Sequence, residues 1–215
     1  MPFNYSKYQE IASYIDKKST ISTKIVAVSK NHEVFAIQEA IRNGVRMFGE
    51  NRVQEAILKF KPLKKTFLDL ELHLTGPLQT NKVKLALSIF DIFQTLDREK
   101  LAREFIKYPL EIKNKKFFIQ VNIGKEENKS GIDPKQTKDF VNYCKNELSL
   151  NIIGLMCIPP INEDAQDYFI MLKKIAQENN LKNLSMGMTS DYKKAIINGA
   201  THIRVGTALF GKRSQ

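Results

Sequence analysis

Apolar strand-like segments alternate with helix-like segments along this chain, and this alternation limits the fold more than any other feature of the sequence. Eight short apolar segments are predicted strands, and they end near Lys30, Phe48, Thr75, Leu96, Ile123, Ile158, Met188 and Val205. An amphipathic helix is predicted over about 5–17, and the helical segments between the strands are about 34–43, 52–60, 81–90, 98–108, 135–148, 164–179 and 192–198. Strands that alternate with helices form parallel sheets, so we predict an α/β fold.

Two α/β architectures fit this pattern. The first is a closed (β/α)8 TIM barrel preceded by an extra N-terminal helix, although 215 residues is near the lower length limit for such a barrel. The second is an open doubly wound sheet, which would place a glycine-rich fingerprint after its first strand. The segment Lys30-Asn-His-Glu33 contains no glycine, which favours the barrel. No low-complexity linker divides the chain, so residues 1–215 are predicted to form one domain.

The charge of the chain does not by itself indicate a nucleic-acid-binding protein. The formal net charge is +11, but the lysines are spread along the chain and no nucleic-acid motif accompanies them. Short basic runs at 59–61, 64–65 and 113–116 are predicted to be solvated loops and helix faces. Such a basic field equally favours small phosphorylated ligands.

The cysteines and the apolar segments indicate an intracellular protein. Cys144 and Cys157 lie in a predicted helix and a predicted strand without CxxC spacing, so we expect reduced core residues. No apolar segment approaches the length of a membrane span, and the N-terminus has no signal-peptide pattern. Three scattered histidines and two cysteines provide no metal-ligand set.

Polar side chains fall on the inward faces of several predicted strands, close to the strand ends. Read with a period of two, the inward polar residues are Lys30, His73, Thr75, Gln120, Asn122, His202 and Arg204. In a barrel this edge is the functional one. Burial at the end of the first strand would lower the pKa of Lys30 and favour the neutral amine that forms a Schiff base. The alternative is that Lys30 only marks where the strand reaches water.

Two segments near the C-terminus suit a phosphate group. Thr189, Ser190 and Asp191 come directly before a predicted helix, and Gly206 and Thr207 follow the last strand. The loops after strands seven and eight are the common phosphate site of barrels. Alternatively, these residues only cap a helix and turn the chain. A phosphate site together with a buried amine suggests pyridoxal 5′-phosphate (PLP) as the cofactor.

Ordered motifs along nearly the whole chain resemble the pyridoxal phosphate homeostasis proteins, also called the YggS or PROSC family, whose fold is like the N-terminal barrel of alanine racemase. The matching segments are Ala27-Val-Ser-Lys30, Phe48-Gly-Glu-Asn51, Val53-Gln-Glu55, His73, Gly76-Pro-Leu-Gln79, Asn81-Lys82, Gln120-Val-Asn122, Lys129-Ser-Gly131, Gly154-Leu-Met156, Met186-Gly-Met188, Asp191, Arg204-Val-Gly-Thr207 and Phe210-Gly211.

The resemblance implies roles for individual residues. It implies that Lys30 forms the Schiff base with PLP, that Thr189, Gly206 and Thr207 bind its phosphate, that Asn51 lines the site and that Arg204 faces the pyridine nitrogen. Two positions depart from the family pattern, because Thr189 replaces a serine and Arg52 replaces a tyrosine.

The resemblance also implies a function, namely PLP homeostasis without established catalysis. Such a cytoplasmic protein would buffer PLP, a form of vitamin B6, or deliver it to apo-enzymes, and so influence amino-acid and keto-acid balance. The first alternative is a low-activity PLP-dependent amino-acid racemase, and the second is a phosphate-ligand barrel enzyme without a Schiff base. Arginine stays charged and would keep the pyridine nitrogen unprotonated, which weakens the electron sink.

Racemisation also requires a second base, which racemases of this fold take from a C-terminal β-domain. Only ten residues follow Val205, so we expect no such domain and a monomer. Other residues that could in principle supply the base are His73, Tyr143 and Tyr192.

Overall fold

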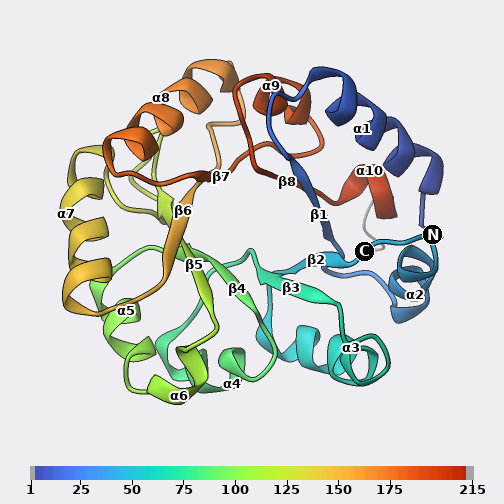
Figure 1. Ribbon diagram of the computed structural model, residues 1–215, viewed down its shortest axis with the longest axis horizontal. Coiled ribbons are helices and arrows are strands. Elements are labelled where there is room, and N and C mark those ends of the chain that lie inside the picture. The colour runs from blue at the N-terminus through green and yellow to red at the C-terminus, as the bar shows by residue number, and fades with distance from the viewer. Residues whose placement is uncertain (1–2, 212–215) are drawn as a thin grey trace.

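The strands form a closed barrel, which confirms the predicted (β/α)8 architecture. The structure is a computed structural model and describes residues 3–211. Each strand pairs in parallel with the next one, and β8 closes on β1 through four pairs that begin with Lys24 and His202 (Figure 1). The strands are β1 (Lys24–Val28), β2 (Met47–Glu50), β3 (Glu71–Leu74), β4 (Ile92–Leu96), β5 (Lys116–Val121), β6 (Ile152–Cys157), β7 (Asn183–Ser185) and β8 (His202–Val205).

Helices surround this barrel on its outside (Figure 1). They are α1 (Tyr5–Lys18), α2 (Val34–Arg42), α3 (Val53–Thr66), α4 (Val83–Leu87), α5 (Glu99–Phe105), α6 (Pro109–Ile112), α7 (Thr137–Asn142), α8 (Ala165–Glu178), α9 (Tyr192–Ile197) and α10 (Thr207–Phe210), with single turns η1 (Thr80–Lys82), η2 (Pro134–Gln136) and η3 (Tyr143–Glu147). The predicted extra N-terminal helix is α1, which contacts α9 and α10.

Some boundaries differ from those predicted. Helix α3 continues to Thr66 although Pro62 lies inside it and removes one backbone N–H donor. Buried Phe60 and Leu63 on either side of Pro62 pack into the core, and this packing outweighs the lost hydrogen bond. The predicted helix 98–108 ends at Phe105, and the short helix α10 was not predicted separately.

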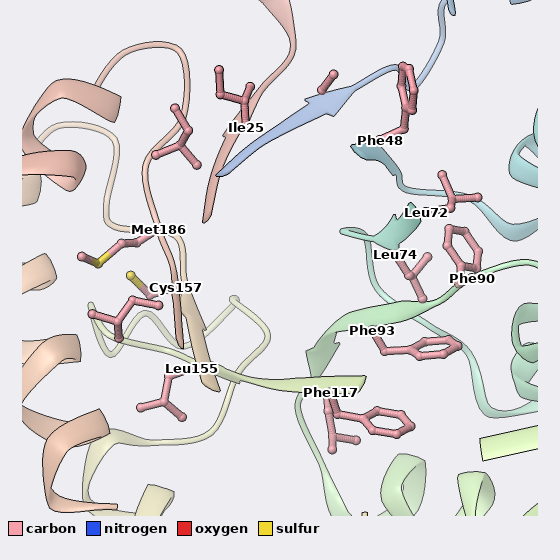
Figure 2. Packing of buried hydrophobic residues seen from close by; sticks show 14 of the residues in the cluster. Ile25, Phe48, Leu72, Leu74, Phe90, Phe93, Phe117, Leu155, Cys157 and Met186 are labelled. Carbon is pink, nitrogen blue, oxygen red and sulfur yellow. The ribbon is translucent and has the colours of Figure 1, made fainter. Parts of the chain in front are cut away.

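The hydrophobic core lies mainly between the barrel wall and the helices. Outward side chains of neighbouring strands, such as Phe93 and Phe117, stack there with their ring centroids 5.3 Å apart (Figure 2). A second, smaller cluster of Ile92, Phe118 and Met156 is separate from this core. The predicted alternation therefore holds, because Leu72 and Leu74 belong to the outer core while His73 between them is bonded to another strand.

The first strand is shorter than predicted. It ends at Val28, and Lys30 lies in the turn that follows, where Asn31 has a positive φ of 60°. Lys30 is half-buried rather than buried. None of the helices in residues 3–211 is long and apolar enough to cross a membrane.

Candidate functional site

A cavity of about 460 Å³ opens at the carboxyl ends of the strands. Its lining comes from the ends of β1, β2, β3, β6, β7 and β8 and consists of Val28, Lys30, Asn51, Thr75, Ile158, Met188, Thr189, Ser190, Arg204, Gly206 and Thr207. All six residues that the sequence predicts for the cofactor therefore border one space. Of the two departures from the family pattern, Thr189 lines the cavity, whereas Arg52 is exposed and lies outside this lining.

The two predicted phosphate segments meet at one side of this cavity. Within residues 3–211, the backbone N–H groups of Thr189, Ser190 and Gly206 donate to no protein acceptor, and the same holds for the three hydroxyls of Thr189, Ser190 and Thr207. Asp191 precedes α9, but its Oδ1 accepts from the amide of Met188 at 2.6 Å instead of capping the helix. This contact tightens the loop and leaves the neighbouring donors for a ligand.

Gly206 lets the end of β8 lie close to β1. A Cβ at this position would lie 3.1 Å from the carbonyl oxygen of Val28, so a larger residue would crowd the end of β1. The backbone of β8 thereby stays close to β1, where the cavity is bordered by both strands.

Asn51 is fixed by a neighbouring strand end. Its Oδ1 accepts from Thr75 Oγ1 at 2.9 Å, which leaves its NH₂ group as the donor toward other partners. Gly76 allows this arrangement, because a Cβ there would lie 2.5 Å from the Asn51 carbonyl oxygen. Asn51 and Thr75 also border a second cavity of about 300 Å³, to which Gln120 and Asn122 contribute.

Arg204 is buried on β8 with only 5% of its surface exposed, and it is held by two hydrogen bonds. Its Nη1 donates to Ser185 Oγ and its Nη2 to the Cys157 carbonyl, both at 2.8 Å. Burial lowers the pKa of Arg204, but a guanidinium remains charged in proteins.

A chain of hydrogen bonds continues from Arg204 across the barrel. Ser185 Oγ donates to Gln94 Oε1 at 2.6 Å, and Gln94 Nε2 lies 2.7 Å from His73 Nδ1. At the far end, His73 Nε2 lies 3.0 Å from Glu71 Oε1.

The direction of each bond in this chain follows from Glu71. A carboxylate only accepts, so His73 carries its proton on Nε2 and Nδ1 accepts from the Gln94 amide. The Gln94 carbonyl oxygen then accepts from Ser185, whose oxygen receives the Arg204 donor. Burial lowers the pKa of His73, which keeps the ring neutral, and the hydrogen bond from His73 lowers the pKa of Glu71 to about 2.

A buried ionic cluster lies behind Lys30, and it corrects the prediction that residues 59–61 are solvated. Lys59 is only 7% exposed, and its Nζ contacts Glu50 Oε1 at 3.2 Å and Glu55 Oε1 at 2.6 Å. Ser29 Oγ also donates to Glu50 Oε1, at 2.7 Å. Burial raises the pKa of Glu50 to about 7, and within the described residues Glu50 Oε2 has no hydrogen-bond partner.

The other titratable residues considered from the sequence lie away from the cavity lining. His202 faces His73 and Phe118, with ring centroids 5.8 and 5.3 Å away, and burial lowers its pKa to about 3. Tyr192 packs edge-on against Tyr14. Cys144 and Cys157 are buried free thiols, as predicted, and burial raises both pKa values to about 12.

The residues present at this cavity fit PLP. Its volume falls within the range of about 300–1,000 Å³ that small-molecule sites occupy. It presents an amine, a buried cation and a set of unused hydroxyl and amide donors, which match an aldehyde, a pyridine nitrogen and a phosphate, respectively. No group of acidic, histidine or cysteine side chains in residues 3–211 could hold a metal ion.

Sequence reasoning missed the residues that support Lys30 and Arg204. Gln94 stands in the otherwise apolar run Ile92-Phe-Gln-Thr-Leu96, and this isolated polar residue was a usable signal. Glu55 and Lys59 are four residues apart on a predicted helix, which is the spacing of an ion pair. Nothing in the sequence showed that this pair is buried.

Comparison with known proteins identifies relatives over most of the chain. The family model "Alanine racemase, N-terminal domain" matches residues 5–214. A protein from Haemophilus influenzae named pyridoxal phosphate homeostasis protein is 38% identical, over 95% of this chain and 91% of its own. A protein of the same name from Aquifex aeolicus is 40% identical, over 88% and 87% of the two chains.

Solved structures show the same similarity. PipY of Synechococcus elongatus without PLP superposes with a TM-score of 0.87 at 37% identity, and it covers 96% of this chain and 99% of its own. The PLP-bound form of PipY gives a TM-score of 0.83 at 36% identity, with the same coverage. Alanine racemase from Corynebacterium glutamicum shares the fold, with a TM-score of 0.70 at 13% identity over 96% of this chain and 60% of the racemase.

Proposed function

Because this chain belongs to the pyridoxal phosphate homeostasis family, which has the alanine racemase N-terminal fold, we propose that it holds PLP as a Schiff base on Lys30. The observation that carries this proposal is that Lys30, Arg204 and the two donor-rich loops border a single cavity. A phosphate on one side and an amine on the other fix both ends of a small aromatic aldehyde.

When bound, PLP supplies an aldehyde carbon with which a neutral primary amine condenses, releasing one water molecule. Lys30 is the amine in this proposal. Thr189, Gly206 and Thr207 bind the phosphate through hydroxyl and amide donors, and Asn51 lines the site with its NH₂ group. Arg204 presents N–H donors toward the pyridine nitrogen and so keeps that nitrogen unprotonated.

The cavity favours binding over turnover. Racemisation needs one proton-transfer group on each face of the substrate, and within residues 3–211 Lys30 and Arg204 are the only ionisable side chains that line the cavity. His73, Tyr143 and Tyr192 are not among them. We therefore propose a non-catalytic protein, with a low-activity amino-acid racemase as the second candidate.

In the cell such a protein would buffer PLP or deliver it to apo-enzymes. The name of the relatives, pyridoxal phosphate homeostasis protein, supports a role in PLP homeostasis. We further propose that residues 1–215 form one PLP-binding domain that acts as a monomer. A cytoplasmic location agrees with the two buried, free cysteines.

Reduction with borohydride tests the Schiff base directly. The protein is incubated with PLP, reduced and digested, and the modified peptide is identified by mass spectrometry, with Lys30→Ala as the control. We expect a pyridoxyl group on Lys30 and its loss in the variant. A wild-type protein without this adduct would contradict the proposal.

A second measurement separates binder from racemase. Holo-protein is incubated with single enantiomers of alanine and serine, and the products are resolved by chiral chromatography. We expect no interconversion above that of free PLP. Turnover that Lys30→Ala abolishes would instead establish the racemase.

A further inference from the structure

The buried ionic cluster behind Lys30 lies outside the cavity, on the side of the barrel wall where α3 packs. We infer that Lys59 and Glu55 are positioning residues that hold the Lys30 turn from behind, so that the Lys30 amine is directed at the PLP aldehyde. This inference rests on the proposed function, because it concerns how the same lysine reacts.

Glu55 and Lys59 face the turn together because they are one helical turn apart on α3. Their side chains form an ion pair of 2.6 Å, because residues at i and i+4 are neighbours on one face of a helix. Both partners are largely removed from water, since 9% of the Lys59 side chain and 20% of the Glu55 side chain are exposed. Burying such a pair is costly unless its hydrogen bonds are satisfied, so the remaining contacts of the pair matter.

The remaining contacts of the ion pair hold Ser29 and Asn31, the residues directly before and after Lys30. Lys59 Nζ donates to the carbonyl oxygen of Ser29 at 2.9 Å. The backbone N–H of Asn31 donates to Glu55 Oε1 at 2.5 Å. The ion pair thus fixes the backbone immediately before and after Lys30, and it makes these contacts without occupying the cavity that Lys30 borders.

A third residue strengthens the hold on Ser29. Glu50 at the end of β2 accepts from Ser29 Oγ at 2.7 Å and from Lys59 Nζ at 3.2 Å. The side chain and the carbonyl of Ser29 are therefore both anchored. Lys30 follows Ser29 directly, two residues after β1 ends at Val28.

Such anchoring is needed because a lysine in a turn reaches its target through a flexible side chain. If the backbone of the turn also moved, the amine would spend little time at the distance and angle that attack on a carbonyl carbon requires. A fixed backbone leaves only the side-chain torsions of Lys30 to be ordered when PLP binds.

The same helix carries a matched control. Lys64 Nζ also contacts one backbone carbonyl, that of Ile89 at 3.0 Å, and one carboxylate, that of Asp91 at 2.5 Å. It makes these contacts between α3 and the start of β4, away from the Lys30 turn. Lys64→Met therefore removes the same kinds of contact from α3, a carbonyl and a carboxylate, without releasing the turn, although Lys59 also contacts a second carboxylate, that of Glu50.

The experiment compares Lys59→Met, Lys64→Met and wild type in apo form. Stopped-flow absorbance after mixing with PLP gives the rate constant of Schiff-base formation, and borohydride trapping confirms Lys30 as the site. We expect Lys59→Met to react about 10- to 100-fold more slowly, which is the cost of misplacing a reacting group by about 1 Å. Lys64→Met should react as wild type does. Equal rates for Lys59→Met and Lys64→Met would overturn the inference.

Hydrogen exchange in the absence of PLP provides a readout that does not depend on the proposed function. We expect the peptide containing residues 29–31 to exchange faster in Lys59→Met than in Lys64→Met. Glu55→Gln keeps an acceptor for the Asn31 amide but loses the ion pair, so it should fall between Lys59→Met and wild type, and it serves if Lys59→Met does not fold. Wild-type exchange rates in both Lys59→Met and Glu55→Gln would contradict the inference. Failure of the wild-type protein to form the Schiff base would contradict only the proposed function.

Discussion

Thr207 illustrates how a single residue can serve binding without serving stability. It begins α10, its side chain is exposed, and within residues 3–211 its hydroxyl has no protein partner. Removing this hydroxyl should therefore leave the free energy of unfolding unchanged in the absence of ligand. Its contribution should appear only when PLP is bound.

We predict that Thr207→Val weakens PLP binding about 10- to 100-fold, because a hydrogen bond to a charged phosphate contributes about 1.5–3 kcal/mol. Equilibrium titration followed by absorbance measures the dissociation constant, and urea denaturation of the apo-protein checks its stability. Thr137→Val is the control, since Thr137 at the start of α7 already donates its hydroxyl to a protein acceptor, the Asp133 carbonyl. Unchanged affinity in Thr207→Val would show that this hydroxyl does not bind the phosphate.

The strands are connected by the hydrogen-bond chain that ends on Arg204. β8, β7, β4 and β3 each contribute a member, so Arg204 and the side chains that hold it come from four separate parts of the sequence. Gln94 occupies the middle position and bonds in both directions. Loss of its amide leaves His73 Nδ1 without a donor and the Ser185 hydroxyl without an acceptor.

We predict that Gln94→Leu lowers the free energy of unfolding by about 2–4 kcal/mol, since each buried group left without a partner costs about 1–3 kcal/mol. Urea denaturation at neutral pH measures this loss. With PLP bound, the absorbance spectrum of the Schiff base should also change, because the Ser185 hydroxyl that accepts from Arg204 loses its own partner. A spectrum identical to that of wild type would show that the chain does not act on Arg204.

The strand and helix order was predictable because each element is short and its apolar period is clear. The inward polar residues were also predictable. Successive side chains of a strand point to opposite faces, so once one residue is assigned to a face the faces of all the others in that strand follow. The end of β1 was placed two residues too late, because a lysine after Ser29 continues the alternation although the backbone turns at Asn31. The burial of Lys59 was not predictable, because it depends on β1, β2 and α3 meeting in space.

The barrel as a whole encloses two neutral histidines, and this makes its stability depend on pH. Burial lowers the pKa of His73 and lowers that of His202 to about 3, so the unfolded chain binds their protons at a higher pH than the folded one does. The two neutral histidines therefore contribute fully to the free energy of unfolding above pH 6.5, and this contribution is lost as the pH falls toward 3. Glu50 has the opposite effect on stability. Burial raises its pKa to about 7, so as the pH falls the folded protein binds this proton before the unfolded chain does, and the folded state is stabilised.

We predict that the free energy of unfolding falls between pH 6.5 and pH 4, with His202 alone contributing on the order of 2–3 kcal/mol near pH 4.5. Glu50→Gln should make this fall steeper, because the variant lacks the proton uptake that stabilises the folded state between pH 7 and about 4.5. Urea denaturation of both proteins across this range measures the two slopes. Parallel pH profiles would show that Glu50 does not titrate as its burial implies.

The placement of the Lys30 support has a practical consequence for protein engineering. The side chains that border the cavity and those that fix the reactive lysine belong to separate sets, because only Lys30 itself is common to the cavity and the anchored turn. The walls of the cavity can therefore be redesigned for other aldehydes, by changing residues such as Ile158 or Met188, while the anchors on α3 keep the amine in place. The barrel thus offers a scaffold for capturing carbonyl compounds in which reactivity and ligand choice are adjusted independently.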